Sequence, residues 1–153
     1  FPLLVRYTMK IRYAHTNIIA HDYKLLASFY QDVFGYTQVG PTRDLSGSWV
    51  NQLTNRVNTT IIGVHLELEE GGPTLEIFQY ETTKPSDKAI NTSGFSHIAF
   101  AVEDVTQTIN SIIAHGGSSL GAIADGMVEG VGMINVAYAK DPEGNILEIQ
   151  KWD

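Results

Sequence analysis

The sequence predicts an α+β fold made of two tandem βαβββ modules. A histidine begins an apolar, strand-like run twice, at His15 in YAHTNIIA and at His97 in FSHIAFAV. A glutamate interrupts an apolar run twice, at Glu76 in PTLEIFQY and at Glu148 in NILEIQKW. Because these features recur in the same order, the chain contains two copies of one unit, and the copies must pair to bury their sheets.

The first copy begins with a strand over residues 11–20. Asp22 is a favourable N-cap for a helix over 23–34, where apolar residues recur at helical spacing, and Gly35 ends that helix. Polar residues 52–59 predict a loop. Further strands are expected at 36–40, 48–54, 60–68 and 73–81.

The second copy repeats this order. A strand over 94–102 precedes a helix capped by Asp104, and a Gly-rich loop follows at 121–132. Strands at 133–140 and 145–152 flank a DPEGN turn. The predicted boundaries are an N-terminal extension at 1–10, module 1 at 11–81, a polar linker at 82–93 and module 2 at 94–153.

The N-terminal extension is apolar but too short for a signal peptide. Met9 followed by KIRYAH is typical of a natural start. Residues 1–8 are therefore expected to be either an addition to the natural chain or an extra strand.

Composition excludes several classes of protein. The 153 residues are 43% hydrophobic, contain no cysteine and carry a net charge of −7. No apolar run approaches the ~20 residues that span a membrane, and no Lys/Arg cluster suggests a nucleic-acid partner. The lack of cysteine excludes disulfides and thiolate zinc sites and fits a cytoplasmic location.

The repeated histidines and glutamates predict a metal site. Strand alternation lets each of the four side chains face away from the leucines and isoleucines that suit packing against helices. One glutamate in an apolar strand is more often an ordinary surface residue, but four such residues at matching places favour metal binding. The expected ligands are His15, Glu76, His97 and Glu148, whereas His21, His65 and His115 are expected to be non-ligands.

With these four residues, the chain resembles the vicinal oxygen chelate superfamily, the glyoxalase/bleomycin resistance/dioxygenase group. The resemblance rests on the four expected ligands, on VFGY at 33–36 and on KDPEGN at 140–145. It implies a cupped, partly open, eight-stranded barrel-like sheet with helices outside. One residue from the first and last strand of each module would hold the metal.

Within the superfamily, the ligand set resembles glyoxalase I-like and methylmalonyl-CoA epimerase-like members. Glyoxalase I places a glutathione-binding Arg where this chain has Ile19 and an Asn where it has Tyr80, so dependence on glutathione is not expected. The epimerases usually carry Gln at the position of Glu76. Extradiol dioxygenases leave that position open, and bleomycin-binding members lack the ligands.

The resemblance implies a metal-dependent lyase, isomerase or epimerase that transfers a proton α to a carbonyl, with Glu148 or Glu76 as the base. The alternatives are an Fe(II) ring-cleaving dioxygenase and a small-molecule binding or resistance protein. The expected cofactor is one divalent ion per site, Zn, Ni or Co before Mn or Fe.

We expect a homodimer acting on a small molecule, with each site built either within one chain or across the dimer. The expected pocket residues are Asn17, Tyr80, Tyr138, Gln150 and Trp152. The cations that could meet an anionic substrate tail are Arg43, Arg56, Lys84 and Lys140.

Overall fold

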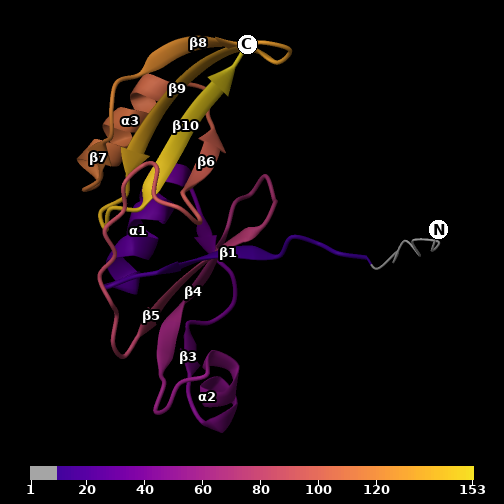
Figure 1. Cartoon of the computed structure of the whole chain (residues 1–153). Helices are drawn as coiled ribbons and strands as arrows, with labels where there is room; N and C mark the ends of the chain where they lie inside the picture. The colour runs from indigo at the N-terminus through magenta and orange to yellow at the C-terminus, as the bar shows by residue number, and fades with distance from the viewer. Residues whose placement is uncertain (1–9) are drawn as a thin grey trace, which may run out of the picture.

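The computed structural model describes residues 10–153 and contains ten strands and three helices over that range. The expectation for residues 1–8 lies outside the described residues. No helix in the described part of the chain is long and apolar enough to cross a membrane. Figure 1 shows one sheet above the other, with α1 near the middle and α2 at the far end of the first module.

The first module is a five-stranded sheet with two helices. Its strands run in the order β1-β5-β4-β2, and the short β3 also pairs with β4. β1 and β5 are parallel, whereas the other pairs are antiparallel. The elements are β1 (His15–Ile19), α1 (Tyr23–Phe34), β2 (Thr37–Gln38), β3 (Arg43–Leu45), α2 (Ser48–Thr54), β4 (Ile61–Glu67) and β5 (Thr74–Tyr80).

The second module repeats this topology in the order β6-β10-β9-β7, with β8 also paired to β9. Two short strands therefore share one edge position in each sheet. This arrangement confirms the predicted α+β class with two βαβββ modules and no closed barrel. The strands form two sheets of five rather than the expected eight strands, because β3 and β8 add a short strand to each module. The elements are β6 (His97–Ala101), α3 (Val105–Ala114), β7 (Ser118–Ser119), β8 (Ala124–Val128), β9 (Gly132–Lys140) and β10 (Ile146–Trp152).

Both long helices begin, and α1 also ends, where the sequence predicts. Asp22 accepts hydrogen bonds from the backbone N–H groups of Lys24 and Leu25, and Asp104 accepts one from Gln107. Gly35 ends α1 with φ 77°, a left-handed conformation that costs glycine little because it has no Cβ.

Two local predictions are wrong. Residues 48–54 form α2 rather than a strand, so α2 also takes up the start of the predicted loop at 52–59. Val50 is the one fully buried residue of this short helix. One apolar position gives the segment little helical periodicity, so tertiary contacts decide that it is helical. The Gly-rich segment 121–132 contains β8, which pairs with β9 although its sequence predicts a loop.

One hydrophobic core spans both modules. The Phe34 ring on α1 stacks on Phe100 of β6, with ring centroids 4.0 Å apart and planes 18° apart. The turn before β10 adds polar contacts to this joint, because Glu143 accepts hydrogen bonds from the backbone N–H groups of His21 and Asp22. The two modules therefore form one continuous body.

A buried Tyr–Asp pair lies at the same joint. The Tyr30 hydroxyl of α1 donates to Asp141 Oδ2 over 2.8 Å, and both residues are buried. Burial, followed by the charge of Asp141, raises the pKa of Tyr30 well above its ordinary value. Burial also raises the pKa of Asp141, although its hydrogen bonds from Tyr30 and Asn145 act in the opposite direction. The DPEGN turn at 141–145 thus also joins the two modules.

Candidate metal centre

The first predicted pair lies on neighbouring parallel strands of module 1. The register sets Asn17 of β1 opposite Glu76 of β5, and His15 lies on the same face as Asn17, one alternation earlier. His15 Nε2 is 3.5 Å from Glu76 Oε1. The core packs against the opposite face through Ile18, so this pair lies on the face that the helices leave open.

Glu76 has two further polar partners. Asn17 Nδ2 donates to Glu76 Oε1 over 2.8 Å, and His65 Nε2 lies 2.7 Å from Glu76 Oε2. The register of β4 with β5 places His65 directly opposite Glu76. Glu76 is only 8% exposed, and its carboxylate oxygens are held from both neighbouring strands.

His65 contacts the candidate site, although the sequence did not predict this contact. Its strand alternates, but the sequence alone did not say which face it occupies or which residue stands opposite it. Burial is the largest cause that lowers the pKa of His65, and the charges of Arg43 and His15 act in the same direction against the attraction of Glu76. A neutral imidazole at neutral pH can donate from Nε2 to the carboxylate.

The second predicted pair lies at the equivalent place in module 2. β6 and β10 are parallel, with Ala99 opposite Glu148, and His97 Nε2 is 2.9 Å from Glu148 Oε2. Tyr138 of β9 stands opposite Glu148, and its ring lies edge-on to His97 with centroids 5.2 Å apart. The two modules thus present the same His–Glu pair at the same register.

The neighbours of the two glutamates differ. Asn17 in module 1 corresponds to Ala99 in module 2, and His65 corresponds to Tyr138. Glu76 therefore has two hydrogen-bonding neighbours besides its histidine, whereas the described residues offer Glu148 only His97 as an ion-pair partner.

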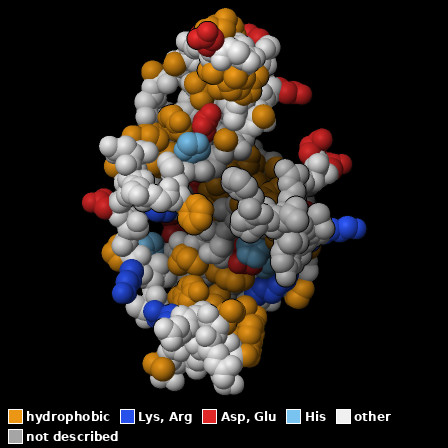
Figure 2. Space-filling view, turned by 45° about the vertical axis from the view of Figure 1, so that its right-hand side comes forward, with side chains coloured by type: hydrophobic (Ala, Val, Ile, Leu, Met, Phe, Trp, Pro, Cys, Tyr) orange, Lys and Arg blue, Asp and Glu red, His pale blue; other side chains and the backbone are white. Residues whose placement is uncertain are grey.

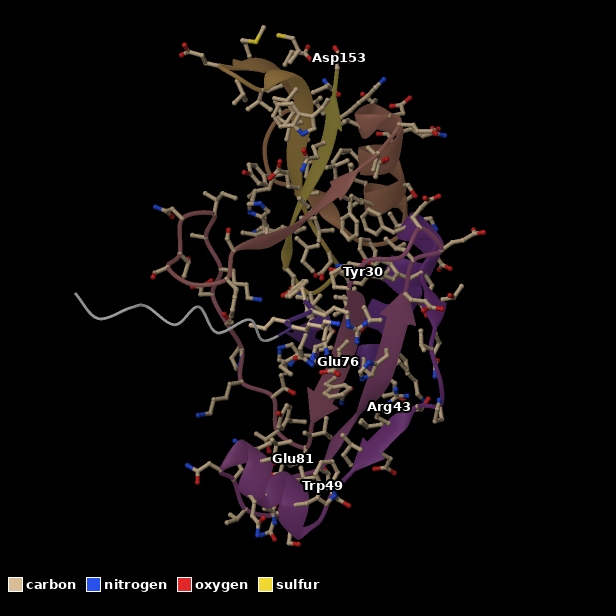
Figure 3. The ribbon with its side chains drawn as sticks, turned by 90° about the vertical axis from the view of Figure 1, so that its right-hand side faces the viewer. Tyr30, Arg43, Trp49, Glu76, Glu81 and Asp153 are labelled. Carbon is tan, nitrogen blue, oxygen red and sulfur yellow. The ribbon has the colours of Figure 1, made fainter. Side chains whose placement is uncertain are left out.

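Within one chain, the four predicted ligands form two pairs and not one cluster. Residues 10–153 contain no group of three or more His, Cys, Asp or Glu side chains placed to hold a metal ion together. Figure 2 shows histidine beside acidic side chains at two separate places on one face, with hydrophobic side chains between them. In Figure 3, Glu76 lies at the centre of module 1, well below the end of β10 at Asp153.

The donors of each pair suit a divalent ion. Each histidine directs Nε2 toward a carboxylate oxygen within 3.5 Å, and both histidines are partly exposed. Imidazole and carboxylate together suit Zn, Ni, Co, Mn or Fe(II), and a site usually needs more donors than one pair supplies. The residues fit a metal, and each pair supplies half of the expected ligand set.

The predicted pocket residues also divide between the modules. Asn17 contacts Glu76, and Tyr80 lines a cavity at the end of β5. Tyr138 packs against His97, and the Trp152 indole donates to the Gln150 side chain farther along β10.

The two remaining histidines lie away from these pairs. His21 uses its backbone N–H to contact Glu143, and the His115 ring contacts the Ser111 carbonyl oxygen at the end of α3.

Paired βαβββ modules with unclosed sheets are the fold of a known superfamily, and comparison with family models identifies the same one. Residues 12–149 match the family model of the glyoxalase/bleomycin resistance protein/dioxygenase superfamily. The chain belongs to this superfamily. A search of curated proteins gives no match.

Solved structures share the fold at low sequence identity. A glyoxalase family protein from Bacillus cereus has a TM-score of 0.82 at 16% identity, covering 96% of this chain and 97% of that one. The trypanothione-dependent glyoxalase I of Leishmania major has a TM-score of 0.62 at 20% identity, covering 93% and 87%. A glyoxalase I mutant from Zea mays has a TM-score of 0.61 at 24% identity, covering 91% of this chain and 44% of that one. These similarities establish the fold.

Proposed function

We propose that this protein is a metal-dependent lyase, isomerase or epimerase that moves a proton α to a carbonyl on a small chelating substrate. The observation that carries the proposal is the His–Glu pair repeated at the same strand register in both modules. Each pair lies on the open face of its sheet, where a substrate can reach it. Membership of a superfamily that contains glyoxalase I supports the same conclusion.

We propose further that the complete site forms between two copies of the chain. One chain holds its two pairs apart, and each pair alone supplies too few donors. In a two-fold dimer, module 1 of each copy can face module 2 of the other, which gives two identical sites. Exposed apolar side chains lie near the ligands in the chain and would be covered by the second copy. Tyr13 and Phe95 each precede a ligand histidine by two residues and are 65% and 111% exposed, and Trp152, at the end of β10, is 40% exposed.

The protein residues have separate tasks in this proposal. His15, His97 and the two glutamates would hold the ion, which would supply Lewis-acid stabilisation of the charge that develops on a substrate oxygen. Glu148 has fewer partners than Glu76, so its carboxylate has more freedom to accept the substrate α-proton and return it. Asn17 and His65 would keep Glu76 fixed by hydrogen bonds, as outer partners orient ligands in other metal sites.

Complementation between two inactive chains tests the shared site. His15→Ala and His97→Ala chains are loaded with metal separately and after co-expression. Neither variant alone should fill its sites. If the site spans two chains, random pairing restores about a quarter of the wild-type metal content, because half of the dimers contain one intact site. No restoration in mixed dimers would contradict a shared site.

Exchange of the substrate α-proton tests the chemistry. Zinc-, nickel- and cobalt-loaded protein is incubated in deuterated water with hydroxy-ketones, hemithioacetals and acyl thioesters. We expect metal-dependent deuterium incorporation with at least one class of compound, and Glu148→Gln should lower it strongly. The proposal fails if no compound exchanges with any loaded form, and oxygen uptake with catechols by the iron form alone would favour a dioxygenase.

A further inference from the structure

A cavity of about 480 Å³ lies at the end of module 1 beside α2. Its lining includes Ile19 at the end of β1, Tyr80 at the end of β5, Leu53 on α2, Arg56 just after α2, and Thr83 and Lys84 after β5. Figure 3 shows Trp49 on α2 and Glu81 near this helix, with Glu76 higher in the same module. The cavity end of the sheet is therefore separated from the ligand pair along the strands.

The cavity lies on the same sheet face as the ligand pair. Ile19 follows His15 by four residues, and Tyr80 follows Glu76 by four, so alternation places all four side chains on one face. Four residues of an extended strand span about 13 Å. A molecule that chelates an ion at His15 and Glu76 and extends along the strands would therefore reach the cavity.

The cavity lining carries a local positive charge. Arg56 Nη2 is 3.0 Å from Glu81 Oε1, and the guanidinium lies 5.8 Å from the Tyr80 ring centroid. The hydrogen bond from Arg56 is the largest cause that holds the pKa of Glu81 below its ordinary value, so Glu81 is charged at neutral pH. Lys84 forms no ion pair within residues 10–153. Two cations and one carboxylate leave one positive charge here, in a chain whose net charge is −7.

Module 2 has no counterpart of this cavity wall. In module 1, α2 is inserted between β3 and β4 and supplies Leu53 and the approach to Arg56. In module 2, the chain passes from β8 to β9 through a short turn near Val131 without a helix. The insertion therefore builds a feature that the metal pair alone does not need.

We propose that this cavity binds the anionic end of the substrate, a single carboxylate or phosphate group on an aliphatic tail whose other end chelates the ion. The inference rests on the proposed function for the position of the chelating end. Ile19, Leu53 and Tyr80 contact the apolar part of the tail. Arg56 and Lys84 contact the oxyanion, and the guanidinium keeps free N–H donors besides the one used by Glu81.

The first test uses a matched pair of eight-carbon hydroxamates, one ending in a carboxylate and one in its methyl ester, titrated into the metal-loaded protein by calorimetry. The carboxylate should bind about 10-fold more tightly than the ester at low salt, because a charged hydrogen bond replaces a neutral contact. Arg56→Gln with Lys84→Gln should remove this preference without changing the affinity for the ester. Lys24→Gln, which removes an exposed cation from α1, is the matched control and should keep the preference.

The second test separates the cavity from the metal. Octanoate, octyl phosphate and octanol are titrated into metal-free, isotope-labelled protein, and amide chemical shifts are followed by NMR. Octanoate or octyl phosphate should shift the amide signals of residues 53–56 and 80–84, and octanol should shift them much less. The compound with the larger response identifies the preferred oxyanion. Lys84→Gln alone repeats the test if the double variant does not fold.

The outcomes distinguish the two proposals. If neither hydroxamate binds better with metal than without, the proposed function fails, and the metal-free titration still decides the cavity. Equal binding of the carboxylate and the ester, a preference that survives the double variant, or shifts elsewhere in the protein would overturn the cavity proposal.

Discussion

In module 1, Glu76 contacts His15, Asn17 and His65, whereas in module 2 Glu148 lies opposite Ala99 and Tyr138 and contacts His97. The two carboxylates occupy the same register in sheets of the same topology.

The difference shows that two copies of a module can place a site residue at the same backbone position and still differ in how firmly they hold its side chain. A carboxylate held from two neighbouring strands suits a fixed ligand, and one with fewer partners suits a base that must move.

The largest expected effect distinguishes the two glutamates. At metal concentrations that saturate each variant, Glu148→Gln should lower α-proton exchange by about 10²- to 10⁴-fold, because the amide cannot accept the proton. Glu76→Gln should lose less exchange activity but need more metal to reach saturation. The measurement is deuterium incorporation with metal titrated independently, and equal loss of exchange in both variants would remove the asymmetry.

The residues opposite the glutamates should differ in their effect on metal affinity. His65→Phe should weaken metal binding about 10- to 100-fold, because it removes a hydrogen-bonding partner of Glu76. Tyr138→Phe, the matched change in module 2, should leave the affinity nearly unchanged. Calorimetric titration with zinc or nickel compares them, and equal effects would show that His65 does not orient Glu76.

The joint between the modules should respond to loss of the buried hydroxyl. Tyr30→Phe should lower the free energy of unfolding by about 1–2 kcal/mol at pH 7, because Asp141 loses one hydrogen bond but keeps that from Asn145. Denaturant unfolding measures this loss. An unchanged midpoint would mean that the joint does not depend on this bond.

The same variant gives a pH test. The raised pKa of Tyr30 means that its neutral form stabilises the folded chain below its unfolded pKa near 10, and that this contribution is lost as the pH rises toward the folded value. Unfolding free energy should therefore fall more steeply above pH 10 in the wild type than in Tyr30→Phe. Tyr36→Phe removes a second tyrosine whose pKa burial raises, so it should change the slope in the same direction but without the loss of a hydrogen bond to Asp141.

The smallest expected effect compares the helix caps. Asp22→Ala removes two hydrogen bonds to backbone N–H groups of α1, and Asp104→Ala removes one from α3. Each should cost about 1 kcal/mol of stability, with the loss at Asp22 the larger. Thermal unfolding of the two variants checks the order, and a larger loss at Asp104 would contradict it.

Much of the fold could be predicted because it depends on local patterns. Asp22, Gly35 and Asp104 mark helix ends through contacts within a few residues, and strand alternation separates the ligand face from the core face. α2 could not be predicted, because one buried valine in a seven-residue helix leaves almost no periodic signal. The strand β8 could not be predicted either, because it depends on pairing with β9 and a Gly-rich sequence gives no strand signal.

The sequence by itself determined the repeated module, the family resemblance and the four candidate ligands, because each follows from motifs and spacing along the chain. Tertiary structure decided that His65 lies against Glu76, that Tyr30 meets Asp141 across the joint, and that the two pairs stay apart within one chain. Those facts depend on strand register and on packing between modules, and both join residues far apart in sequence.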